Sequence, residues 1–303
     1  MFDRILIAVD GSDETRHAAR RGLGLAKVLN TTVEVLHVVP QKSLRVTQTA
    51  DEQTQLRDRG EAALAEIEEL ASELNYPVST QLSEGKPATR ISEYAAEQDA
   101  DLIVIGRQGM TGLGKRLLGG ITEQVLHQSD VPVFVVPDAD QAIEAVTEYA
   151  RILIPTDGSE NAEVATPYGT AIAQSYDSDV HILNIVDLQA AGGAFNAGGL
   201  EKEFIERLEA RGQEAVERIE NEIEETTSSL DVVTAVERTT SFDGAAAGVR
   251  EYVENNDIDL IIMGSHGRSN LRRQLLGSIA SSVLRTVNVP VLVVKMAVRE
   301  NDL

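Results

Sequence analysis

Short apolar runs alternate with longer amphipathic segments along the whole chain. Runs such as 5–9 and 260–263 hold no charged residue, as expected of strands buried on both faces of a sheet. Between the runs, apolar residues recur at helical spacing, for example at Ala18, Ala19 and Leu23 within segment 14–29. Strands that alternate with helices predict an α/β fold with a mainly parallel sheet and right-handed connections.

The predicted elements fall into two similar halves. In the first half we expect strands at 5–9, 32–39, 77–82, 102–105 and 131–136, and helices at 14–29, 51–74, 88–98 and 120–128. The second half repeats this order from 152–154 to 289–294, with a long charged helix at 201–225. The sequence therefore predicts two tandem five-stranded, mainly parallel sheets with flanking helices. The predicted domains are 1–138 and 151–297, with a linker at 139–150 and a C-terminal tail at 298–303.

The offset between the halves changes along the chain. Asp157 follows Asp10 by 147 residues, whereas Gly264 follows Gly106 by 158 residues. The second half therefore holds a net insertion of eleven residues between these points. We expect it in the Ala- and Gly-rich segment 188–199.

Composition narrows the classes of protein to consider. The 303 residues carry a formal net charge of −22, which argues against binding nucleic acid or anionic membranes. Such a surface fits a salt-loving host, and an ordinary acidic cytosolic protein is the alternative. No cysteine is present, which excludes disulfides, thiol catalysis and cysteine-ligated metals. We find neither a signal peptide nor the roughly 20 apolar residues of a membrane span, and expect a cytoplasmic protein.

A glycine pattern, G-x2-G-x9-G, occurs once in each half. Its positions are Gly106, Gly109 and Gly119, and Gly264, Gly267 and Gly277. Each copy begins where an apolar run ends and leads into a predicted helix. Glycine loops and helix starts present backbone N–H groups to an anion, so the pattern predicts a phosphate site. One such loop would be read as a tight turn, but two loops with the same spacing favour nucleotide binding.

Three features together resemble the universal stress protein family over almost the whole chain. They are the two glycine patterns, the Asp-Gly-Ser near the start of each half, and the Val-Pro-Val-x-Val-Val at each end. The resemblance implies a Rossmann-like fold related to the adenine-nucleotide alpha hydrolases. It also implies binding of ATP, ADP or AMP, with Mg²⁺ carried by the phosphates as an option. In the family the last strands pair across a dimer, so we expect an internal pseudo-dimer of the two halves, further homo-oligomers as an option, and a protein partner not yet identified.

The resemblance also assigns nucleotide-binding residues. In the second half it implies that adenine and ribose are bordered by Pro155, Thr156, Asp157 and Ile185. The ribose and phosphates would be lined by Met263, Gly264, His266, Gly267, Gly277, Ser278, Ile279 and Ala280. The first-half set is Ala8, Val9, Asp10, Val38, Ile105, Gly106, Gly109, Gly119, Gly120, Ile121 and Thr122. The resemblance predicts two hydroxyl side chains in each half, and each half keeps one of them. The first half has Gly120 where the second has Ser278, and the second half has Ala280 where the first has Thr122. We expect both halves to bind, the second more tightly.

Some of these residues have a second interpretation. Asp10 and Asp157 are either ribose ligands or part of a helix cap, since Asp-Gly-Ser precedes a helix in both halves. Basic side chains within the glycine patterns either compensate phosphate charge or lie on solvated surfaces; they are Arg107, Lys115, Arg116, Arg268, Arg272 and Arg273. For His266 we expect a hydrogen bond rather than a metal, and His37, His127 and His181 are read as packed or surface residues.

The leading hypothesis is a tandem nucleotide-binding sensor or regulator of the stress response. A lysine loop of the P-loop type and a positioned general base are both absent from the sequence, so no catalytic or metal residue is assigned. Turnover, if any, would be a weak ATPase or autophosphorylation. Two alternatives stay open: a partner-binding dimerisation module with vestigial nucleotide sites, and a slow ATP-hydrolysing or nucleotidyl-transfer enzyme.

Overall fold

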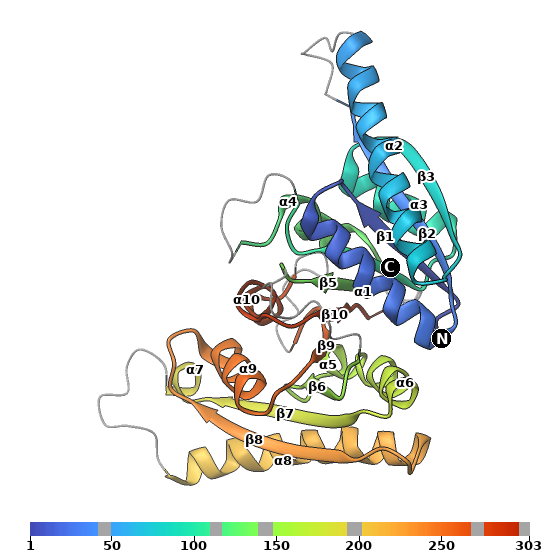
Figure 1. The fold of residues 1–303 in the computed structure, drawn as a ribbon. Helices are drawn as coiled ribbons and strands as arrows, with labels where there is room; N and C mark the ends of the chain where they lie inside the picture. The colour runs from blue at the N-terminus through green and yellow to red at the C-terminus, as the bar shows by residue number, and fades with distance from the viewer. Residues whose placement is uncertain (42–49, 110–116, 139–147, 193–201, 268–275, 297–303) are drawn as a thin grey trace, which may run out of the picture. The chain divides into compact units, whose positions relative to one another are not determined.

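The structure is a computed structural model that describes residues 1–41, 50–109, 117–138, 148–192, 202–267 and 276–296 (Figure 1). The chain divides into two units, Met1–Thr147 and Glu148–Leu303.

Five parallel strands form the sheet of the first unit, in the order β3-β2-β1-β4-β5. The strands are β1 (Arg4–Val9), β2 (Thr32–Pro40), β3 (Val78–Gly85), β4 (Leu102–Gly106) and β5 (Val133–Val136). The helices are α1 (Asp13–Leu29), α2 (Ala50–Glu73), α3 (Pro87–Glu97) and α4 (Gly120–Gln128). Helices α1 and α2 pack on the sheet and on each other, while α3 packs against α4, so two helical layers enclose the sheet.

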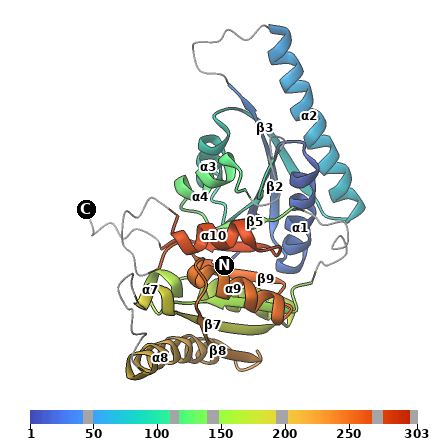
Figure 2. The same ribbon diagram turned by 90° about the vertical axis from the view of Figure 1, so that its left-hand side faces the viewer.

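The second unit repeats this arrangement, with strand order β8-β7-β6-β9-β10 and every pair parallel (Figure 2). Its strands are β6 (Arg151–Pro155), β7 (Asp179–Asp187), β8 (Val232–Thr239), β9 (Leu260–Gly264) and β10 (Val291–Val294). Its helices are α5 (Glu160–Glu163), α6 (Thr166–Tyr176), α7 (Leu188–Gly192), α8 (Lys202–Thr226), α9 (Gly244–Asn255) and α10 (Ser278–Thr286). Helix α8 covers one face of β7 and β8, and α9 lies on the other face. The α/β prediction of two tandem five-stranded sheets is confirmed.

The uncharged runs are the central strands. Ile5 to Val9 of β1 and all of β4 and β9 are buried, because helices cover both faces of the sheet. Each central strand, β1 or β6, has neighbours on both sides that come from later in its own unit. The strand order reverses there, and the carboxyl ends of the strands form a crevice at such a point. Asp10 and Asp157 follow the ends of β1 and β6, so the crevice lies beside them.

The helix after the first strand differs between the units. Helix α1 is continuous, whereas its counterpart is split into α5 and α6. Pro167 lies in the first turn of α6. Proline lacks an N–H and clashes with the preceding turn, so it fits a helix start but not a helix interior.

The prediction that the whole insertion lies in 188–199 is wrong. The ends of β2 and β7 are separated by the same number of residues as Asp10 and Asp157. The starts of α2 and α8 are separated by more residues than that. This separation grows again before the start of β8, and only β9 reaches the offset that separates the two glycine patterns. The connection between β7 and α8 therefore holds only part of the insertion, and the rest lengthens the connections that flank β8. Surface connections absorb such changes because they pack against few neighbours.

Candidate functional site

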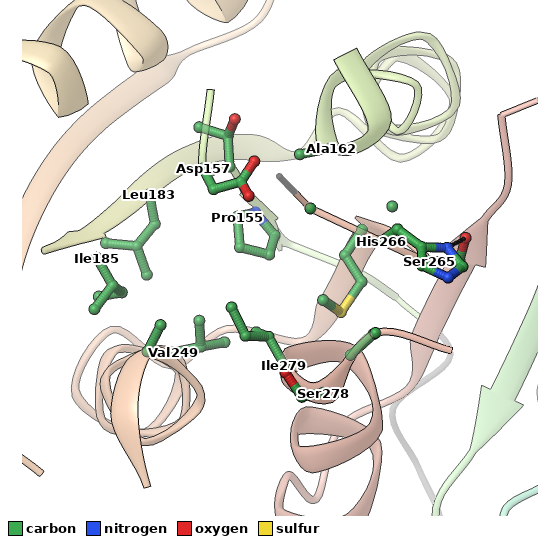
Figure 3. Close-up of a pocket in the computed structure, with 17 residues that line it drawn as sticks. Pro155, Asp157, Ala162, Leu183, Ile185, Val249, Ser265, His266, Ser278 and Ile279 are labelled. Atoms are coloured by element: carbon green, nitrogen blue, oxygen red, sulfur yellow. Dashed lines mark hydrogen bonds between the residues drawn. The ribbon is translucent and has the colours of Figure 1, made fainter. Parts of the chain in front are cut away.

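The second unit has a cavity of about 270 Å³ at the carboxyl ends of its strands (Figure 3). All twelve residues assigned to the second half line it: Pro155, Thr156, Asp157, Ile185, Met263, Gly264, His266, Gly267, Gly277, Ser278, Ile279 and Ala280. Leu183, Ile185 and Val249 lie together as an apolar wall of the cavity in Figure 3. Sequence reasoning missed Ala162, Leu183, Ala245, Val249 and Ser265.

The first unit has a cavity of about 620 Å³ at the matching place. Nine of its eleven assigned residues line the cavity: Ala8, Val9, Asp10, Val38, Ile105, Gly106, Gly109, Ile121 and Thr122. Gly119 and Gly120 do not line it; they begin α4 beside it. Pro87 and Ile91 of α3 were missed, although they precede Ala245 and Val249 by the same offset that separates the two glycine patterns. This common offset could have identified the two residues as lining the cavity from the sequence.

The middle glycine of each pattern is required by the aspartate of the same unit. A Cβ on Gly109 would overlap Oδ2 of Asp10, and a Cβ on Gly267 would overlap Oδ2 of Asp157. The carboxylate therefore rests against the glycine backbone in both units. A side chain at either position would displace the aspartate as well as narrow the cavity.

The aspartates also support the helix caps. Oδ1 of Asp10 accepts hydrogen bonds from the backbone N of Ser12 and from Oγ1 of Thr15, both at 3.0 Å. Oδ1 of Asp157 accepts from the N of Ser159 at 3.0 Å and from its Oγ at 2.6 Å. The N-cap residues are Ser12 and Ser159. The side chain of each accepts a hydrogen bond from the backbone N–H three residues later in the chain. The aspartates are therefore not the N-caps; one carboxylate oxygen of each supports the capping turn, and Oδ2 lies against the glycine loop.

The last glycine of each pattern begins a helix that lacks a side-chain cap. Gly119 and Gly277 are extended N-cap residues of α4 and α10. Neither glycine can supply a side-chain oxygen, so the first N–H groups of each helix have no capping side chain. These groups and the helix dipole attract an anion. Ile121 and Ile279, in the first turns, line the two cavities while being 43% and 40% exposed.

The polar side chains of the two glycine loops have partners. Thr122 Oγ1 donates to the Gly106 carbonyl at 2.8 Å, so the hydroxyl retained in the first half serves the fold. Gln108 donates to the Leu117 carbonyl at 2.6 Å, and Nδ1 of His266 lies 2.9 Å from Ser265 Oγ. Arg107 pairs with Asp138 at 3.3 Å and does not line the cavity. The other five candidate cations, Lys115, Arg116, Arg268, Arg272 and Arg273, lie outside the described residues.

His37 and Asn184 occupy matching positions on β2 and β7. Asn184 donates from Nδ2 to the Thr156 carbonyl at 2.8 Å, which holds the strand end before Asp157. His37 has a hydrogen bond to the backbone of Val9, the residue that precedes Asp10. Burial lowers the pKa of His37, while the Asp10 charge and the Val9 bond act in the opposite direction. The neutral imidazole is therefore the form that the folded unit favours.

Replacing His37 by asparagine should reduce the loss of stability in mild acid. The unfolded histidine takes up a proton near its ordinary pKa of about 6.5, whereas the folded one resists until a lower pH. Stability from this residue is thus present above about pH 6.5 and lost as the pH falls below it. We expect urea unfolding of H37N to show a smaller drop in free energy between about pH 7.5 and pH 5.5. An equal drop in the free energy of unfolding in H37N and wild type would contradict this prediction. The pKa of His181 is also lowered by burial, but its contribution is the same in both proteins and cancels in the comparison.

Among the described residues there is no group of three or more His, Cys, Asp or Glu side chains that could hold a metal ion. Within the same part of the chain, no helix is long and apolar enough to cross a membrane.

Comparisons with known proteins agree on one family. The model of the universal stress protein family matches twice, over residues 1–137 and 148–295. A universal stress protein of Mycolicibacterium smegmatis is 26% identical over 96% of both chains, and MJ0531 of Methanocaldococcus jannaschii is 34% identical over 45% of this chain and 82% of its own. The crystal structure of a universal stress protein from Archaeoglobus fulgidus has a TM-score of 0.71 at 22% identity, covering 97% of this chain and 96% of that one. The double match places this chain in the universal stress protein family, as a tandem member.

Proposed function

We propose that each unit binds one adenine nucleotide and that the protein acts as a nucleotide-dependent regulator in the stress response. One observation carries the proposal. In both units a strand-end aspartate, a glycine loop and a helix start without a side-chain cap meet at one edge of the sheet. A ribose and a phosphate chain need acceptors and donors in that order, and the fold supplies both at its switch point.

The cavity of the second unit suggests how the nucleotide would lie. Adenine would contact the apolar wall of Leu183, Ile185 and Val249. The ribose hydroxyls would donate to the carboxylate of Asp157. The phosphates would accept from the backbone N–H groups at the start of α10, with the Ser278 hydroxyl as a further donor. Mg²⁺ would be held by the phosphate oxygens, since no acidic cluster is present among the described residues.

The test is the nucleotide content of freshly purified protein. We expect heat-released nucleotide, identified by mass spectrometry, to approach two adenine nucleotides per chain. Titration calorimetry with and without Mg²⁺ should resolve two affinities. The second unit should be tighter because Ser278 adds a hydroxyl bond that Gly120 cannot make, a difference of about 0.5–1.5 kcal/mol. Absence of bound nucleotide, together with no heat on adding Mg-ATP at high salt, would overturn the proposal in favour of a partner-binding module.

A further inference from the structure

The two cavities differ in extent on the side of the long helix. The first cavity measures about 620 Å³ and the second about 270 Å³. Five residues of α2 line the first: Leu56, Arg59, Ala62, Ala63 and Glu66. No described residue of α8, the matching helix, lines the second. The first cavity therefore continues past the strand ends to the surface of α2. We call this added part the α2 extension.

The ion pair between the long helix and the first helical segment is inverted between the two units. Arg218 of α8 pairs with Glu163 and also donates from Nη2 to the Gly158 carbonyl at 3.3 Å, which ties the helix to the turn after Asp157. Glu66 of α2 stands at the matching position, six residues after the helix glycine, and pairs with Arg16. A carboxylate cannot donate to the Gly11 carbonyl, so the first unit lacks this tie. Ala63 of α2 approaches Gly11 instead, and the cavity beside Asp10 continues along α2.

The extension holds one basic side chain. Arg59 lies one helical turn before Ala63, whose Cβ is the nearest atom to the place a Cβ of Gly11 would take, at 3.2 Å. Its neighbour Arg57 pairs with Glu61 and Glu84, but Arg59 has no ion pair or hydrogen bond with any described residue. Arg211 precedes Gly212 as Arg59 precedes Gly60, yet it does not line the second cavity. The two arginines thus form a matched pair of which only one faces a cavity.

We infer that the first unit selects an adenine nucleotide that carries a second phosphate on its ribose, at the 2′ or the 3′ oxygen. The inference rests on the proposed function, in which the ribose lies against Asp10. A ribose substituent at that place would enter the α2 extension. One phosphate leaves the other ribose hydroxyl for Asp10 and meets the guanidinium of Arg59, whose fork suits a phosphate. Glu66 does not oppose it strongly, because Arg16 neutralises its charge.

The experiment isolates the sites with matched variants. I279E removes the second site and I121E the first, for the reason given in the Discussion. In I279E, calorimetry should show adenosine 2′,5′- or 3′,5′-bisphosphate binding roughly tenfold or more tightly than 5′-AMP. The two isomers distinguish which ribose oxygen carries the phosphate. Adding Arg59→Gln should abolish the preference. In I121E, 5′-AMP should bind at least as tightly as either bisphosphate, and Arg211→Gln should change neither affinity.

The outcomes separate this inference from the proposed function. If I279E binds 5′-AMP but neither bisphosphate more tightly, the inference fails and the nucleotide site stands. The same holds if Arg59→Gln weakens 5′-AMP and the bisphosphates by equal factors. If neither background binds any adenine nucleotide, both proposals fail. Arg59 is exposed, so Arg59→Gln should melt within a few degrees of its parent; circular dichroism checks this.

Discussion

Replacing Ile279 by glutamate should weaken nucleotide binding in the second unit by roughly a hundredfold or more. Ile279 lies in the first turn of α10, lines the cavity and is 40% exposed. A carboxylate there would occupy the positive end of the helix and repel the phosphates that we place at the same N–H groups. Two like charges about 4 Å apart repel by roughly 4 kcal/mol at an effective dielectric of 20, and a nucleotide brings more than one charge.

The fold should survive this change, which makes the result interpretable. Acidic residues in a first helical turn stabilise the helix by about 0.3–1 kcal/mol. The matched control is I279Q, because glutamine has the size of glutamate without its charge. I279Q should therefore lose much less affinity for the nucleotide. I121E should act in the same way on the first unit, since Ile121 is 43% exposed in the first turn of α4. Calorimetry should therefore count one site per chain in either single variant and none in the double variant. Two sites in I279E would show that the phosphates lie elsewhere.

Replacing Gly264 by alanine should destabilise the second unit by about 3 kcal/mol. A Cβ on Gly264 would overlap the carbonyl oxygen of Asn161 and lie 2.9 Å from its carbonyl carbon. These are backbone atoms of α5, which cannot move without shifting the capped turn after Asp157. The first glycine of the pattern therefore permits a strand end and a helix to approach closely, whatever the ligand.

Alanine substitutions at two further glycines test whether the loss of stability follows the steric overlap. A Cβ on Gly106, the counterpart of Gly264, would lie 2.9 Å from the Gln108 carbonyl oxygen and 3.6 Å from that of Glu14, so G106A should cost less. A Cβ on Gly120 would meet nothing within 4 Å, and G120A should change the free energy of unfolding by less than about 1 kcal/mol. Urea unfolding of the three variants should follow that order. A loss in G120A equal to that in G264A would contradict the steric explanation.

The three glycines of the pattern thus have three different roles, which the sequence alone cannot separate. Gly264 is needed by backbone packing and Gly267 by the Asp157 carboxylate, while Gly277 begins the helix that we propose binds phosphate. Spacing showed that the three belong together. It did not show that a side chain at Gly267 would also displace Asp157, so a substitution there would disturb the capped turn as well as the cavity.

Much of the architecture followed from the sequence alone. Uncharged runs such as 5–9 marked the buried strands, because a strand covered on both faces tolerates no charge. The repeated aspartate and glycine positions placed the residues that gather at each cavity, since parallel strands end at the same edge of a sheet. The family followed from the same pattern. These features are encoded locally or by repetition, so one sequence suffices to read them.

Only the tertiary structure decided how the two sites differ. Helices α2 and α8 have similar patterns of apolar residues, and the charge reversal between Glu66 and Arg218 looks in the sequence like an ordinary difference between two exposed helix surfaces. Its meaning depends on which atom each side chain reaches across the unit, Arg16 in one case and the Gly158 carbonyl in the other. The engagement of Thr122 with the Gly106 carbonyl was hidden for the same reason. Sequence spacing fixes which elements meet, whereas cavity size and hydrogen-bond partners depend on contacts between residues far apart in the chain.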